Sequence, residues 1–116
     1  MIDWDRVTEL RTEIGEEGFA EVVELFLDEV EGVVMKLHAA MSPEQIEDDL
    51  HFLKGGAWNL GFSAFGAYCE DGERKATIGQ AAAVDLTRVA DCYFESKAEF
   101  LAGLERQEPG RASTAA

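Results

Sequence analysis

The sequence predicts an all-α fold: an antiparallel up-down-up-down four-helix bundle with a short N-terminal helix that covers one end. Three observations lead to this prediction. Apolar residues recur at intervals of three and four along most of the chain, which is the period of amphipathic helices. No alternating run rich in β-branched residues competes with that period. The links between the helical segments are short, and short links favour antiparallel neighbours.

The covering helix is expected over residues 4–14. Asp3 is suited to cap its N-terminus, because a carboxylate accepts hydrogen bonds from the free N–H groups of the first turn. Gly15 is suited to end it, because glycine readily adopts the left-handed conformation of a helix C-cap. Its apolar positions are Trp4, Val7, Leu10 and Ile14.

Four apolar sets define the bundle helices, and each set is expected to face the core. The first is Phe19, Val23, Phe26, Val30, Val33 and Leu37. The second is Ile46, Leu50, Leu53, Ala57 and Leu60. The third is Phe62, Phe65, Cys69, Gly72 and Ala76, and the fourth is Leu86, Val89, Tyr93, Ser96, Phe100 and Leu104.

The second bundle helix has the clearest start signal. Ser42 is expected to be its N-cap, and Pro43 occupies its first position, where the missing N–H costs nothing. Gln45 stands where a capping box has its reciprocal partner.

A chain of 116 residues is long enough for one core, and we assign residues 1–106 to a single domain. Residues 107–116 are small and polar and are expected to be a disordered tail. No apolar stretch is long enough for a membrane span, and no signal peptide is visible. A cytoplasmic location is therefore expected. The complete helical pattern and the tail favour a standalone protein over a domain cut from a longer one.

The chain is strongly acidic, with a formal net charge of −14. Nucleic acid and anionic membranes would repel it and are not expected as partners. The same charge can steer the chain toward a basic patch on another protein.

His51 is expected to project into solvent from the middle of the second bundle helix. At about 100° per residue it lies roughly 140° from the centre of the apolar stripe. Glu47 and Asp48 precede it by one turn on the same face, and Lys54 and Gly55 follow it by one turn. Glycine costs a helix interior about 1 kcal/mol relative to Ala. Clearance beside the imidazole explains why Gly55 is there.

The stretch HFLKGGAWNLG around His51 resembles the phosphorylation-site helix of histidine-containing phosphotransfer (HPt) domains, four-helix bundles that act in phosphorelays. The residues that match the family pattern H-x-x-K-G-x-x-x-N-x-G are His51, Lys54, Gly55, Asn59 and Gly61. Cys69 and Glu73 match its usual Cys and Glu in the next helix. The resemblance covers nearly the whole chain, over residues 2–104.

The resemblance implies that His51 accepts a phosphoryl group from an aspartate of one receiver domain and passes it to another. Lys54 would lie near the phosphoryl oxygens, and Gly55 would give the receiver room to dock. Asn59 and Gly61 would finish the helix.

Elementary chemistry agrees with these roles. An imidazole that titrates near its usual pH of about 6.5 is mostly neutral and nucleophilic near pH 7. Nothing in the sequence resembles a nucleotide-binding loop or a kinase site, so a phosphoryl carrier is expected rather than an enzyme. No cofactor is expected, and the Mg²⁺ that supports in-line transfer is expected on the receiver. The expected partners are response-regulator receiver domains, including that of a hybrid histidine kinase, and the expected state is a monomer.

Glu47, Asp48 and Trp58 are expected to belong to the docking surface for the receiver. Trp58 stands where the family generally has a small residue. It can contact the receiver, restrict which receivers fit, or lie flat over a neighbouring helix. Gly72 stands where the family usually has Leu, so a gap in the core is expected, filled by Phe65 or another nearby aromatic residue.

Other readings of the chemistry-bearing residues are weaker. Asp48 and His51 have the i, i+3 spacing of a di-iron bundle, but such a site needs two pairs and inward carboxylates, so no metal site is expected. Cys69 and Cys92 lie at apolar positions outside any CxxC motif and are expected to be free core thiols. His38 ends its helix, where a favourable interaction with the helix C-terminus is expected. The alternative function is a non-catalytic module that binds receivers without phosphotransfer.

Overall fold

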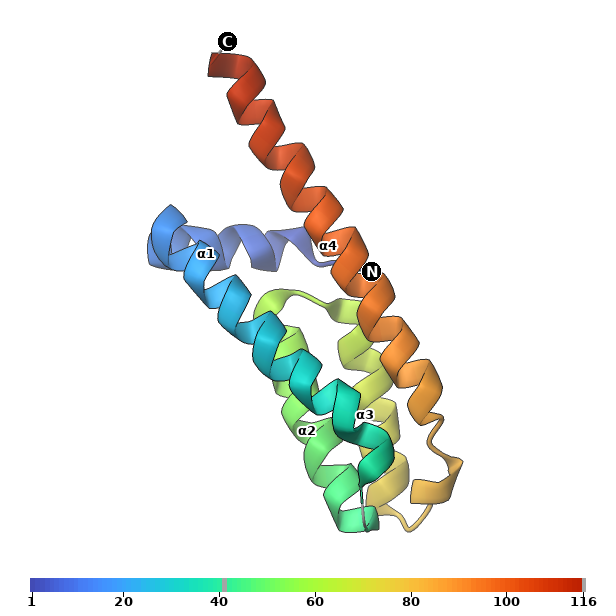
Figure 1. The fold of residues 1–116 in the computed structure, drawn as a ribbon. Coiled ribbons are helices and arrows are strands. Elements are labelled where there is room, and N and C mark those ends of the chain that lie inside the picture. Colours follow the sequence, from blue (N-terminus) through green and yellow to red (C-terminus); the bar gives the residue numbers. More distant parts are fainter. Residues whose placement is uncertain (41, 116) are drawn as a thin grey trace.

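The computed structural model contains four packed helices, which confirms the predicted fold class (Figure 1). It describes residues 1–40 and 42–115, with side chains described up to residue 106, and no strand occurs in this part of the chain. The helices are α1 (Trp4–Lys36), α2 (Pro43–Leu60), α3 (Ser63–Thr77) and α4 (Leu86–Ala115). Two 3₁₀ turns, η1 (Leu37–Ala39) and η2 (Ala81–Ala83), lie in the links. The predicted tail at 107–116 lies outside the fully described residues.

Helix α1 unites the predicted covering helix and the first bundle helix across a sharp bend. Gly15 makes the bend with φ 78° and ψ 165°, a conformation that favours glycine. Asp3 is the predicted N-cap, and its side chain accepts a hydrogen bond from the Arg6 backbone N–H at 3.2 Å. The arm before the bend crosses one end of the bundle (Figure 1). There Trp4 stacks on Phe100 of α4, with ring centroids 5.9 Å apart, and closes that end of the core.

Helices α2 and α3 form an antiparallel hairpin, and both ends of α2 are as predicted. The Ser42 hydroxyl accepts a hydrogen bond from the Gln45 backbone N–H at 3.1 Å, and Pro43 is the first helical residue. Gly61 ends the helix in the left-handed conformation, with φ 84°. A Cβ at Gly61 would lie 2.8 Å from the Asp3 carbonyl oxygen, so only glycine fits the turn.

The apolar sets of the four helices meet in one core, as predicted. The largest fully buried side chains include Leu50, Leu53, Phe62, Phe65, Tyr93 and Phe100. Cys69 and Cys92 are buried there as free thiols, and burial raises the pKa of both. Among the described helices, none combines the length and the apolar character needed to cross a bilayer.

The predicted gap at Gly72 is wrong. A Cβ at this position would lie 2.9 Å from Leu50 Cδ1 and 3.2 Å from Val84 Cγ1, so aliphatic side chains already occupy the space. Phe65 lies instead against Tyr93, with ring centroids 5.4 Å apart. Glycine therefore lets Leu50 and Val84 approach the α3 backbone closely.

Candidate functional site

The imidazole of His51 stands on the outer surface of α2, in the middle of the helix. Its side chain is 69% exposed, which confirms the predicted orientation. The ring leans toward α3, where Nδ1 lies 2.7 Å from Oε2 of Glu73. The other ring nitrogen, Nε2, is not used by this contact.

Lys54, one turn later on α2, contacts the same carboxylate. Its Nζ atom lies 2.7 Å from Oε1 of Glu73, and its side chain is 24% exposed. Each oxygen of Glu73 thus holds one group of the predicted site. The side chain of Glu73 is 18% exposed, so it is largely covered by its surroundings.

The protonation of this cluster follows from its contacts. Burial raises the pKa of Glu73, but hydrogen bonds from Lys54 and His51 outweigh burial and leave the pKa below its ordinary value. The hydrogen bond with Glu73 raises the pKa of Lys54. Glu73 is therefore a carboxylate near pH 7, and a carboxylate can only accept hydrogen bonds. The proton of the contact must then be on Nδ1 of His51, and whenever such a ring is neutral its lone pair is on Nε2.

The two adjacent glycines after Lys54 have different surroundings. A Cβ at Gly55 would have no atom within 4 Å, so this position is open, as predicted. A Cβ at Gly56 would lie 2.9 Å from Cγ2 of Val30, because α1 crosses α2 closely there. Gly55 leaves space at the surface, whereas Gly56 allows two helices to pack.

The three residues predicted for docking are placed differently from one another. Trp58 lies over α3, where a Cβ on Gly66 would be 3.1 Å from its ring atoms, and it still exposes 42% of its surface. Packing over a neighbouring helix is thus the observed arrangement among its three possible roles. Glu47 is half-buried and accepts a hydrogen bond from the Thr77 hydroxyl at 2.7 Å. Asp48 is exposed.

The end of the motif connects α2 to the N-terminal arm. Gly61 forms the C-cap described above. Asn59 is exposed, and its backbone carbonyl accepts a hydrogen bond from Nε of Arg6 at 3.1 Å. This contact holds the arm of α1 against the end of α2.

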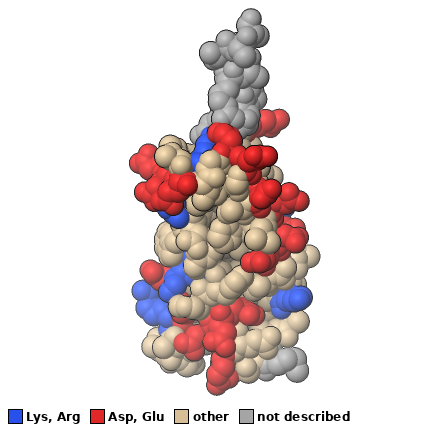
Figure 2. Space-filling view, turned by 90° about the vertical axis from the view of Figure 1, so that its left-hand side faces the viewer, with Lys and Arg blue, Asp and Glu red and all other residues tan. Residues whose placement is uncertain are grey.

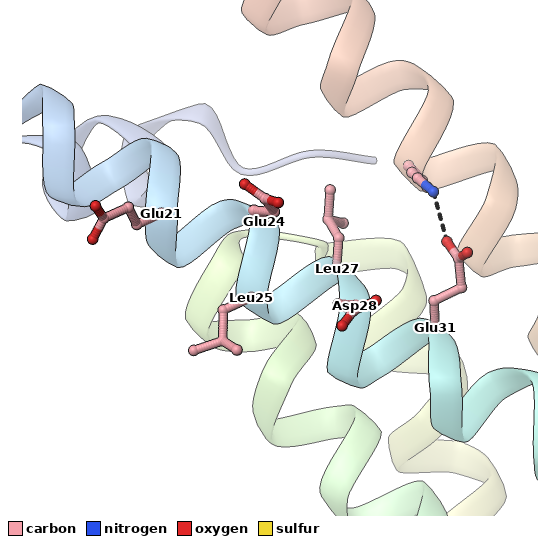
Figure 3. A pocket seen from close by; sticks show the side chains of 7 residues that line it. Glu21, Glu24, Leu25, Leu27, Asp28 and Glu31 are labelled. Atoms are coloured by element: carbon pink, nitrogen blue, oxygen red, sulfur yellow. Dashed lines mark hydrogen bonds and ion pairs between the residues drawn. The ribbon is translucent and has the colours of Figure 1, made fainter.

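A larger hollow elsewhere offers no comparable chemistry. It has a volume of about 570 Å³, lies between α1 and α4, and is lined by four carboxylates, two leucines and Lys97 (Figure 3). One of the carboxylates, Glu31, is held by Lys97 at 2.6 Å and by the Tyr93 hydroxyl at 3.2 Å. The hollow holds no nucleophile beside a base and shares no lining residue with the surroundings of His51. Within the described part of the chain, no group of three or more His, Cys, Asp or Glu side chains is arranged for a metal ion.

Glu73 is a site residue whose role does not follow from the sequence. It was matched to the family pattern in the third bundle helix, but its link to His51 depends on how α3 packs on α2. Its position four residues after buried Cys69 was the available signal, because residues four apart lie on one helix face.

Comparison with known protein families gave a match over most of the chain. A family model described as Hpt domain matches residues 21–106. The comparisons with curated proteins and with solved structures gave no match. The matched range contains every residue of the cluster around His51 and begins after the bend in α1.

Proposed function

The chain belongs to the Hpt domain family of phosphorelays, and we propose on that premise that His51 is its phosphoryl-accepting residue. The observation that carries the proposal is the pairing of an exposed imidazole with a carboxylate at Nδ1, at 2.7 Å. With the proton on Nδ1, the lone pair of a neutral ring is on Nε2, the nitrogen that does not contact Glu73.

The proposed step is an in-line displacement at phosphorus. The Nε2 lone pair attacks the phosphorus of an aspartyl phosphate on a receiver domain, and an N–P bond forms as the P–O bond to the aspartate breaks. The aspartate leaves with the electron pair as a carboxylate. Nδ1 keeps its proton, so the phosphorylated ring carries a positive charge that the Glu73 carboxylate opposes. The reverse sequence passes the phosphoryl group to a second receiver.

Lys54 supports the negative charge that arrives with the phosphoryl group. Its ammonium is held one helical turn from His51 by the ion pair with Glu73, at 2.7 Å. A positive charge near phosphoryl oxygens favours their approach, as lysines do at phosphate sites in general.

The partners we propose are receiver domains of response regulators, with Mg²⁺ supplied by the receiver rather than by this chain. Members of the family carry phosphoryl groups and have no kinase activity of their own. We further propose that the protein acts as a monomer in the cytoplasm and that its domain comprises residues 1–106.

The test is transfer from receivers that have been phosphorylated with a labelled small phosphodonor. The parent protein and a His38→Gln variant should acquire acid-labile phosphate, because His38 lies in η1 away from the cluster. A His51→Gln variant should acquire none and should keep the parental melting temperature, since the side chain is exposed. Equal labelling of the His51 variant would refute the assignment.

A further inference from the structure

The hollow between α1 and α4 has one strongly acidic wall (Figure 3). Glu21, Glu24 and Asp28 line it from α1, and their i, i+3, i+7 spacing places them on one helix face. All three are exposed, and none has an ion-pair partner in the described part of the chain. Glu31, the fourth carboxylate, is held by Lys97 at 2.6 Å. The α1 wall therefore carries three negative charges that no nearby cation offsets.

The α4 side of the hollow carries exposed apolar side chains. Lys97 lines the hollow from α4. Phe94 and Leu101 lie three residues before it and four residues after it, so they share its helix face. Phe94 is 41% exposed and Leu101 is 43% exposed. Large apolar side chains that are exposed together and rimmed by charge are typical of interaction sites.

The two walls form a groove between two helices. Helices α1 and α4 run in opposite directions and diverge from the ion pair between Glu31 and Lys97 toward the N-terminal arm (Figures 1 and 3). Leu101, one turn beyond Lys97, therefore lies on the same side of this ion pair as Glu24 and Leu27. Figure 3 shows Leu27 pointing into the space between the helices. The groove thus has an acidic edge on α1 and an apolar edge on α4.

The charge on this side of the molecule decides which partner fits the groove. Figure 2 shows acidic side chains gathered along the side of the molecule that α1 forms, and the whole chain carries a formal net charge of −14. The potential around the hollow is therefore negative. A negative potential attracts basic partners and repels nucleic acid, anionic membranes and a second copy of this chain.

We propose that the hollow between α1 and α4 is the docking groove for a basic amphipathic helix of another protein. The apolar face of that helix packs on Leu27 and Leu101, and its lysines or arginines meet the three unpaired carboxylates of α1. The hollow shares no lining residue with the surroundings of His51, so this partner leaves the imidazole accessible. The inference does not rest on the proposed function.

Two features favour a helix over a small polycation such as a polyamine. A polyamine would pair with the carboxylates but would leave Phe94 and Leu101 in water. The three carboxylates also extend over seven residues of α1, which is about 10 Å along the helix axis. A helix laid along the groove presents its own side chains at the same i, i+3, i+7 spacing.

The probe for this groove is a synthetic peptide of about 14 residues, with leucines along one helical face and lysines along the other. A scrambled peptide of the same composition has the same charge but no apolar face, so it is the control for charge alone. We expect the full chain to bind the amphipathic peptide about tenfold more tightly than the scrambled one or better, as measured by fluorescence anisotropy. Changes in nitrogen-15 amide shifts should map the peptide to α1 around Glu24 and to α4 around Leu101.

A pair of variants tests the apolar edge of the groove. Leu101→Ala should weaken binding of the amphipathic peptide about fivefold, because it truncates an apolar side chain that the peptide covers. Met35→Ala should bind the peptide like the parent, because Met35 is an exposed apolar side chain of α1 that does not line the hollow. Both side chains are exposed, and thermal unfolding confirms that each variant is folded.

A second pair tests the acidic edge. Glu24→Gln combined with Asp28→Asn should weaken binding and reduce its dependence on salt, because two charges of the groove are removed. Glu44→Gln combined with Asp48→Asn removes the same charge from α2, outside the hollow. This control should have the smaller effect.

Four results would overturn the inference. Equal affinity for the scrambled peptide, or no binding of either peptide, would show that the hollow recognises no amphipathic helix. Equal losses from the two charge-neutralising pairs would show only general attraction to an acidic chain. Amide shifts confined to the surroundings of His51 would place the peptide elsewhere. Concentration-dependent dimerisation that Leu101→Ala abolishes would assign the surface to a second copy of the chain.

Discussion

The Nδ1 atom of His51 and the Nζ atom of Lys54 each lie 2.7 Å from a different oxygen of the Glu73 carboxylate. One side chain of α3 therefore contacts both α2 groups that we propose meet the phosphoryl donor. Because α2 and α3 are joined by the tight turn at Gly61, the hairpin holds this geometry before any partner binds. We propose that Glu73 is a positioning residue, which acts through its contacts with His51 and Lys54.

Removal of the Glu73 carboxylate should impair transfer without removing the nucleophile. We expect Glu73→Ala to slow transfer about tenfold, because a hydrogen bond to a charged group contributes about 1.5–3 kcal/mol and exposure places this one at the lower end. Glu73→Gln should be intermediate, because its amide oxygen still accepts the Nδ1 proton. Nitrogen-15 spectra of the imidazole should show the Nδ1–H tautomer in the parent and a mixture in Glu73→Ala.

Asp71→Ala is the control for this series. Asp71 is a carboxylate on the same helix, paired with Arg74 and Lys75 and not with His51. It should leave both the tautomer and the transfer rate unchanged. An unchanged tautomer in Glu73→Ala would show that the contact does not orient the ring.

The cluster of His51, Lys54 and Glu73 should make the free energy of unfolding depend on pH below neutrality. The folded pKa of Glu73 is below its ordinary value of 4.5, so its contribution is present above that value and is lost as pH falls through the folded pKa. The stability difference between the parent and Glu73→Gln should be constant near neutral pH and shrink below about pH 4.5. Denaturant titrations from pH 3 to pH 8 measure it. If the stability difference between the parent and Glu73→Gln instead grew as the pH fell, the folded pKa of Glu73 would not be lowered, and the stated effect of its hydrogen bonds would be contradicted.

Lys54→Ala should slow transfer but not prevent it, because the nucleophile remains. An interaction of about 1 kcal/mol, as between charges 4 Å apart in water, corresponds to about a fivefold lower rate. Lys54→Arg keeps the charge and should be closer to the parent. Single-turnover transfer measures both variants, and complete loss in Lys54→Ala would indicate a structural role for the lysine.

The adjacent glycines should respond in opposite ways. Gly55→Ala should stabilise the helix by up to about 1 kcal/mol, since Ala is the better helix former and the space is open. Gly56→Ala should give no net stabilisation or should destabilise the protein, because overpacking against Val30 costs about 1–3 kcal/mol. Thermal unfolding measures the pair, and equal stabilisation would refute the close crossing of α1 and α2.

Variants at Gly55 and Gly56 should also differ in their rates of phosphoryl transfer. Gly55→Gln should keep the melting temperature and strongly reduce transfer, because its side chain occupies the approach to His51. Gly56→Ala should reduce transfer less. Parental transfer by Gly55→Gln would show that clearance is not the role of this glycine.

The features predicted from the sequence are those that depend on short-range patterns. The caps at Asp3, Ser42 and Gly61 and the outward face of His51 follow from turn chemistry and helical period, and the structure confirms them. The fold class follows from the apolar sets in the same way.

The features that the sequence did not predict depend on how helices pack. The space at Gly72 is filled by the side chains of Leu50 and Val84, which belong to other parts of the chain. The sequence pattern of α3 alone therefore could not predict how that space is filled. The contacts of Glu73 likewise arise between helices, because its carboxylate on α3 reaches His51 and Lys54 on α2. The sequence leaves three arrangements open for Trp58, and the structure shows the one in which it lies over a neighbouring helix, at Gly66.

We propose that Glu73 holds the proton on Nδ1 of His51 and so directs phosphorylation to Nε2. Nitrogen–phosphorus correlation spectra of the protein, labelled with nitrogen-15 histidine and phosphorylated by a receiver, test it directly. We expect one N–P bond, at Nε2 of His51, and no phosphate on His38. Phosphate on Nδ1 of His51, or on His38, would contradict it.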